Sequence, residues 1–182
     1  MAGKRQKTEK LNLTLERVAN ILNLNGIKNW FVMYGTLLGI HRGGSCIEGD
    51  DDIDIIINVE YDQLKTILEK EGFGLTQAHG IGTSKDILKT EQTEELSSVD
   101  FYISKFLDNN TISVPWQRHI LKNCFTESNT FVEHKFHSSI IYFPNDYENK
   151  IIQMYGKDWR IPANKSCKRG WGRKRRRFRQ IG

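Results

Sequence analysis

The chain has 182 residues, of which 38% are hydrophobic and 27% charged, a balance typical of a soluble globular domain with a packed core. No apolar run approaches the roughly 20 residues that a membrane-spanning helix requires, and the polar start MAGKRQKTEK excludes a secretory leader. Cys46, Cys124 and Cys167 match neither a disulfide framework nor a CxxC metal pattern, so we expect a reducing, cytoplasmic setting.

The net charge of +5 is unevenly distributed. Residues 165–182 hold nine Lys or Arg and no acid, whereas residues 1–164 hold 18 bases and all 22 acids. We therefore predict a domain at 11–164 between a disordered N-terminus at 1–10 and a basic, disordered tail at 165–182. Three interpretations of the tail stay open: a solvated end, a nucleic-acid-binding or localisation patch, and an anchor to anionic surfaces.

The first predicted element is a helix over 13–24, because its apolar residues recur every three or four positions. Asn12 or Thr14 is its expected N-cap, and the Asn-Gly pair at 25–26 ends it. A short buried strand at 29–35 follows, and a glycine-bounded turn then opens a short helix over the segment GTLLGIHR.

A strand rich in β-branched residues is predicted at 52–59, followed by an amphipathic helix at 61–72. Further strands, some of them short or irregular, are expected at 73–82, 85–92, 97–104, 111–116, 130–136 and 138–144. The last helix, 145–156, begins with an Asn/Asp-x-x-Glu capping box and ends at a glycine. This order predicts a mixed α/β or α+β fold, with a small mixed sheet flanked by helices.

The stretch EGDDDIDIII, residues 48–57, runs a cluster of aspartates into a buried strand. Side chains alternate across a strand, so Asp52 and Asp54 project from one face, about 6.6 Å apart, while Ile53, Ile55 and Ile57 pack on the other. Two such carboxylates suit Mg²⁺ or Mn²⁺, which leave room for phosphate oxygens. Asp50 and Asp51 precede the regular strand, and we expect them to support the metal ligands from outside or to have a structural role.

A two-metal centre needs a third carboxylate from a neighbouring strand. Asp100 is the best candidate, because it is an acid inside the otherwise apolar strand SSVDFYIS at 97–104. The alternative is that Asp100 caps a turn or faces solvent.

Gly35 and Thr36 stand where a strand turns into a helix, a place where backbone N–H groups can bind phosphate. Arg42 either contacts the same phosphate or pairs with the acid cluster. Lys85 and Lys89 flank a predicted strand near the site, and we expect a solvated face for them rather than phosphate binding.

The segment GTLLGIHRGGSCIEGDDDIDI resembles the signature of the LicD family, the phosphocholine transferases grouped with the fukutin proteins. That signature is Gly-Thr-Leu-Leu-Gly, two residues, Arg, seven residues and Asp-Asp-Asp-Ile-Asp, and the chain reproduces it over 35–54. The strand around Asp100 and the closing segment 142–162 are also similar to the family, so that the resemblance spans roughly residues 13–164. One departure is Glu48-Gly49, which stands where family members carry Pro-Trp.

The resemblance implies a nucleotidyltransferase-like fold in which Gly35 and Thr36 hold the donor's phosphates. It implies that Asp52, Asp54 and Asp100 bind Mg²⁺ or Mn²⁺. The chemistry of phosphoryl transfer agrees, and we expect that Asp54 or Asp100 also takes the acceptor's proton. Known family activities move phosphocholine or a phospho-alditol from CDP-choline or a CDP-alditol to a glycan hydroxyl.

The alternative is a nucleotidyltransferase that acts on RNA, a nucleotide or a small molecule, which the basic tail motivates. A non-catalytic binding module is disfavoured because the whole acidic triad is present.

Overall fold

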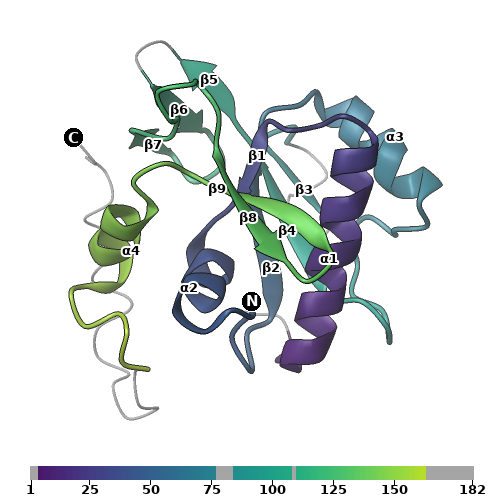
Figure 1. Ribbon diagram of the computed structural model, residues 1–182. Helices are drawn as coiled ribbons and strands as arrows, with labels where there is room; N and C mark the ends of the chain where they lie inside the picture. The colour runs from purple at the N-terminus through teal and green to yellow at the C-terminus, as the bar shows by residue number, and fades with distance from the viewer. Residues whose placement is uncertain (1–3, 77–83, 108–109, 163–182) are drawn as a thin grey trace.

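The computed structural model describes residues 4–76, 84–107 and 110–162 (Figure 1). The basic tail at 165–182, whose disorder was predicted, lies outside the described residues, as does most of the strand predicted at 73–82. The helices of the described part are α1 (Thr8–Leu24), α2 (Tyr34–Gly43), α3 (Tyr61–Lys70) and α4 (Tyr147–Tyr155). None of them is both long and apolar enough to cross a membrane.

The central sheet has four strands in the order β1 (Trp30–Val32), β2 (Asp52–Ile57), β4 (Ser98–Ile103) and β3 (Ile87–Lys89). Strands β2 and β4 run parallel, whereas β1 and β3 pair antiparallel on the two outer sides. Ile53, Ile55 and Ile57 of β2 are fully buried, as the alternation in the sequence predicts, and Ile56, on the face of the aspartates, is fully buried too. Strand β2 is therefore anchored in the core by one face and presents Asp52 and Asp54 on the other.

Two smaller sheets complete the α+β fold. One is the three-stranded sheet β5 (Lys105–Leu107), β6 (Thr111–Val114) and β7 (His119–Lys122), and the other is the hairpin β8 (Val132–Phe136) with β9 (Ser139–Phe143). Strand β9 contacts both α1 and β1, so the hairpin lies beside α1 and in front of the central sheet in Figure 1. The predicted class, small mixed sheets flanked by helices, is confirmed.

The predicted disorder of residues 1–10 is wrong for the described residues 4–10. Helix α1 begins at Thr8, whose backbone N–H and hydroxyl both donate to Glu48 Oε2, at 2.8 and 2.7 Å. The Gln6 N–H donates to the Asp50 carbonyl at 2.8 Å, and the Gly49 N–H donates to the Gln6 carbonyl at 3.0 Å. The start of the chain is thus hydrogen-bonded to the loop that precedes β2.

Both expected helix caps are wrong. Asn12 and Thr14 lie inside α1, where their side-chain oxygens accept backbone N–H groups from Cys46, at 2.9 Å, and Ser97, at 2.8 Å. Helix α4 has no capping side-chain bond, and Glu148 of its predicted capping box pairs with His41 at 3.0 Å instead. These polar side chains connect distant segments rather than closing the turn in which they stand.

Candidate active site

Three charged side chains stand in one row across the central sheet. Asp54 on β2 is in register with Asp100 on β4, and Asp100 is in register with Lys89 on β3. Asp52 lies two residues before Asp54 and so projects from the same face. The structure therefore brings the three aspartates of the sequence prediction together, at a place where the Asp52 and Asp100 side chains are only 19% and 13% exposed.

Lys89 lies between two of these carboxylates. Its ammonium donates to Asp52 Oδ2 at 3.1 Å and to Asp100 Oδ1. The expectation of a solvated face is wrong for Lys89, because its strand pairs with β4 and turns the side chain toward the acids. It holds for Lys85, which is 71% exposed and pairs with Asp62 at 2.5 Å.

The carboxylates of the site are poorly neutralised. Burial, reinforced by the charge of Asp52, raises the pKa of Asp100 to about 6. Burial also raises the pKa of Asp54 well above its usual range, with Asp52 and Asp100 adding to the effect. The pKa of Asp52 is raised by burial, although Lys89 opposes the shift. Several destabilised carboxylates in one place are typical of a cation-binding site.

Tyr102 is a member of the site that the sequence prediction missed. Its hydroxyl donates to Asp54 Oδ1 at 3.1 Å. Burial, followed by the charge of Asp54, raises the pKa of Tyr102, so the phenol remains a hydrogen-bond donor. Tyr102 follows Asp100 by two positions in β4, and strand alternation alone places both on one face.

The Gly-Thr pair at the start of α2 lies directly beside the carboxylates. The Asp54 N–H donates to Thr36 Oγ1 at 2.9 Å, and Thr36 is only 2% exposed. Gly35 is packed against the Asp50 carboxylate so closely that a Cβ at this position would force the two apart. A larger residue at position 35 would therefore require the Asp50 side chain to move.

Arg42 lies in the last turn of α2, away from the Gly-Thr end of the helix. Its guanidinium contacts the Trp159 carbonyl at 3.5 Å. An ion pair between Arg42 and the acid cluster is not found among the described residues. Its predicted contact with donor phosphate stays a prediction.

The acidic loop before β2 adds to the set of oxygen ligands. Carboxylate oxygens of Asp50, Asp51 and Asp52 lie within 4.8 Å of one another, close enough to share a cation. Burial and the neighbouring Asp52 raise the pKa of Asp50 to about 6. Hard carboxylate oxygens with one ammonium among them fit a divalent cation, and the supporting or structural role expected for Asp50 and Asp51 stays a prediction.

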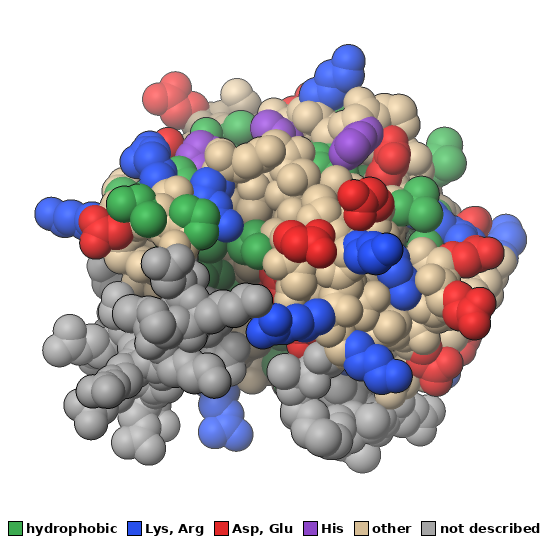
Figure 2. Space-filling model, turned by 90° about the horizontal axis from the view of Figure 1, so that it is seen from below, with side chains coloured by type: hydrophobic (Ala, Val, Ile, Leu, Met, Phe, Trp, Pro, Cys, Tyr) green, Lys and Arg blue, Asp and Glu red, His purple; other side chains and the backbone are tan. Residues whose placement is uncertain are grey.

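The outer surface carries both signs of charge. Figure 2 shows acidic and basic side chains interspersed over the described part of the face seen from below.

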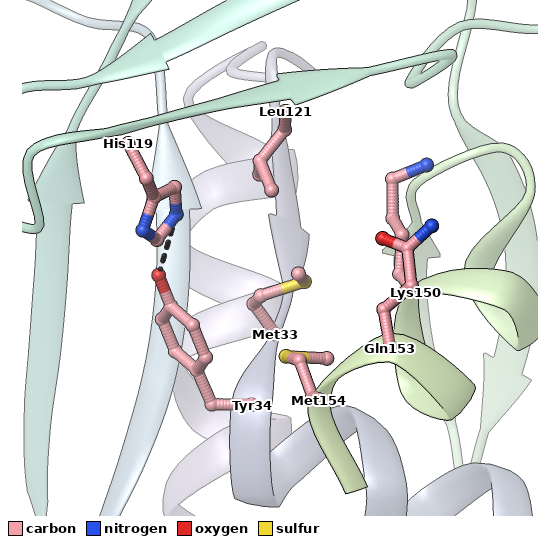
Figure 3. Close-up of a pocket in the computed structure, with 7 residues that line it drawn as sticks. All are labelled: Met33, Tyr34, His119, Leu121, Lys150, Gln153 and Met154. Carbon is pink, nitrogen blue, oxygen red and sulfur yellow. Dashed lines mark hydrogen bonds between the residues drawn. The ribbon is translucent and has the colours of Figure 1, made fainter. Parts of the chain in front are cut away.

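A small pocket lies between α4, β7 and the start of α2 (Figure 3). It is lined by Met33, Tyr34, His119, Leu121, Lys150, Gln153 and Met154. His119 Nε2 and the Tyr34 hydroxyl are 3.1 Å apart, and burial lowers the pKa of His119 to about 4, which keeps its imidazole neutral. The Tyr34 ring meets the Tyr102 ring edge-on at 5.5 Å, so the pocket adjoins the carboxylate site.

Comparison with known proteins gives one family and one fold. A sequence model described as LicD/FKTN/FKRP, nucleotidyltransferase domain, matches residues 27–164. No curated protein matches the chain.

Among solved structures, the chain is similar to the lincosamide antibiotic adenylyltransferase LnuA with lincomycin bound, at 13% identity and a TM-score of 0.55 over 93% of this chain and 97% of that one. It is similar to an antigenic nucleotidyltransferase-like protein from Paracoccidioides brasiliensis, at 14% identity and a TM-score of 0.53 over 94% and 75%. The antibiotic-resistance factor ANT(2'')-Ia matches at 12% identity and a TM-score of 0.55 over 92% and 88%. The predicted nucleotidyltransferase-like fold is confirmed.

Proposed function

Because the chain belongs to the LicD/FKTN/FKRP family of nucleotidyltransferase domains, we propose that this transferase moves phosphocholine or a phospho-alditol from a CDP-activated donor to a glycan hydroxyl. The observation that supports the proposal is the register of Asp54, in the family signature, with Asp100, in the second strand that is similar to the family. Asp52 on the same face and the Gly35-Thr36 backbone beside them complete the arrangement. A cytoplasmic location stays a prediction.

In this proposal Asp52, Asp54 and Asp100 hold Mg²⁺ or Mn²⁺, with Asp50 and Asp51 close by. A bound cation supplies neutralisation of the donor's phosphate charge. Gly35 and Thr36 offer the first N–H groups of α2 to the same phosphates, which fixes the donor's orientation. Arg42 is a further proposed contact, which requires its guanidinium to leave the Trp159 carbonyl.

The reaction follows from this placement. The acceptor's hydroxyl oxygen attacks the phosphorus that carries the choline or alditol, the bond from that phosphorus to the bridging oxygen breaks, and CMP leaves with the electron pair. The proton of the hydroxyl passes to Asp54 or Asp100.

A thermal-shift panel tests the proposal. The ligands are CDP-choline, CDP-ribitol, CDP-glycerol and the four nucleoside triphosphates, each with and without Mg²⁺. We expect Mg²⁺-dependent stabilisation by a CDP-linked donor, and its disappearance in Asp52→Asn. The stabilising donor is then assayed for release of CMP in the presence of glycan acceptors.

A second candidate is nucleotidyl transfer to RNA, a nucleotide or a small molecule. It is supported by the shared fold with a protein described as an antibiotic adenylyltransferase, a likeness that extends over 97% of that chain. Stabilisation by a nucleoside triphosphate, together with incorporation of its nucleotide into a product, would establish this function instead. For an RNA acceptor, deleting residues 165–182 is expected to remove salt-sensitive RNA binding.

A further inference from the structure

Lys89 occupies the place where a cation shared by Asp52 and Asp100 would bind. Its ammonium is hydrogen-bonded to one oxygen of each carboxylate, and its side chain is 23% exposed. The Lys89 ammonium therefore partly neutralises the two carboxylates, as a bound metal ion would.

A divalent cation and the Lys89 ammonium compete for the same oxygens. Mg²⁺ binds carboxylate oxygens at about 2.0–2.1 Å, and a positive charge that remained hydrogen-bonded to those carboxylates would repel it. The Lys89 side chain can leave these carboxylates while its backbone stays paired with β4, because the side chain is long and partly exposed.

We propose that Lys89 is a built-in counter-ion that the divalent cation displaces, and that its released ammonium then binds the donor's diphosphate. This inference rests on the proposed function, because it takes Asp52 and Asp100 as ligands of the cation. Once displaced, the Lys89 ammonium still lies near the carboxylates but has lost its hydrogen bonds to Asp52 and Asp100. A diphosphate can both ligate the bound cation and accept hydrogen bonds from the Lys89 ammonium.

Cation and donor binding are then coupled. The cation alone must break two ion-paired hydrogen bonds of Lys89, whereas the cation together with a diphosphate gives the ammonium new partners. Each ligand therefore strengthens the binding of the other, by the same factor in both directions. Such coupling makes the site bind free cations more weakly when no donor is present.

The first test measures the Kd of Mn²⁺ alone by titration calorimetry, with the full chain in each case. We expect Lys89→Met, which keeps length but removes charge, to bind Mn²⁺ about tenfold more tightly than the wild type, because the competitor is gone. Lys89→Gln is a second uncharged variant in case the first does not fold. Lys85→Met is the matched control, because its ammonium pairs with the exposed Asp62 and its loss is expected to leave the Kd unchanged.

The second test repeats the titration with CDP present. We expect CDP to tighten Mn²⁺ binding by a larger factor in the wild type than in either Lys89 variant. Equal Kd values for Mn²⁺ alone in the wild type and both variants would overturn the displacement, and an equal gain from CDP would overturn the role in donor binding. Neither result contradicts the proposed function. If Asp52→Asn binds Mn²⁺ with the same Kd as the wild type, both the proposed function and the inference are contradicted.

Discussion

Asp54 and Asp100 lie directly opposite each other on the parallel strands β2 and β4. Like charges on facing strand positions repel, and removal from water raises the penalty. The folded protein therefore contains an electrostatically unfavourable pair at the centre of the site. The following predictions concern this pair and the groups around it.

Asp100→Asn is expected to change the pH dependence of stability in EDTA. The folded-state pKa of Asp100 is raised to about 6, above the value of about 4 in an unfolded chain, so the folded state binds more protons between these values. The stability that this group contributes is fully present below pH 4 and is lost as the pH rises through 6. Relative to the wild type, Asp100→Asn should gain about 2 kcal/mol between pH 4 and pH 7.

Urea unfolding of both proteins at a series of pH values checks this prediction. A stability difference between them that stays constant from pH 4 to pH 7 would show that Asp100 does not titrate in the predicted window.

Asp52→Asn is expected to reduce transfer by roughly 10²–10³-fold or more, because the site loses a charge that positions the cation. The mutant should still fold, since Asp52 lies at the start of β2 and its side chain is not part of the apolar core. Transfer assays and circular dichroism measure the two effects. Asp62→Asn, an exposed aspartate on α3, is the matched control, and full activity of Asp52→Asn would rule out its proposed role.

Gly35→Ala is expected to destabilise the protein by about 1–3 kcal/mol, because the added methyl group collides with the Asp50 carboxylate. Gly43→Ala provides the comparison within the same helix, since a Cβ there meets nothing within 4 Å. Its effect should be neutral or slightly stabilising. Thermal denaturation compares the two, and equal losses of stability would contradict the close packing of Gly35 on Asp50.

Thr36→Val is expected to cost about 1–3 kcal/mol, because the Asp54 N–H loses its acceptor and valine offers none. Thr36→Ser retains the oxygen and should be much closer to the wild type in the free energy of unfolding. If valine and serine behave alike in urea unfolding, the hydrogen bond does not stabilise the start of β2 as the structure indicates.

The carboxylates of the site were predictable because their evidence is local. Alternation in β2 separates the aspartates from Ile53, Ile55 and Ile57, and an acid in the apolar strand β4 points to a shared face. The placement of Lys89 was not predictable, because it depends on the register between β3 and β4, which no local pattern of apolar and polar residues determines. Tyr102, by contrast, follows from the same alternation once Asp100 is assigned to the site.

The fold was predictable where elements are long and periodic. The short strands β5 and β7, of three and four residues, were not predicted, because so few positions cannot establish a period. The ordered structure of residues 4–7 was also not predicted. Gln6 is joined to the acidic loop through backbone groups, and backbone hydrogen bonds leave no trace in composition.

The parallel pairing of β2 with β4 also bears on how the chain folds. Asp54 and Tyr102 are in hydrogen-bond contact although they are 48 positions apart. Parallel neighbours need a long crossover, and pairings of this kind form slowly. A partly folded chain in which these strands have not yet paired has no assembled carboxylate site. A cation that recognises only the finished sheet is therefore expected to slow unfolding while leaving the folding rate unchanged.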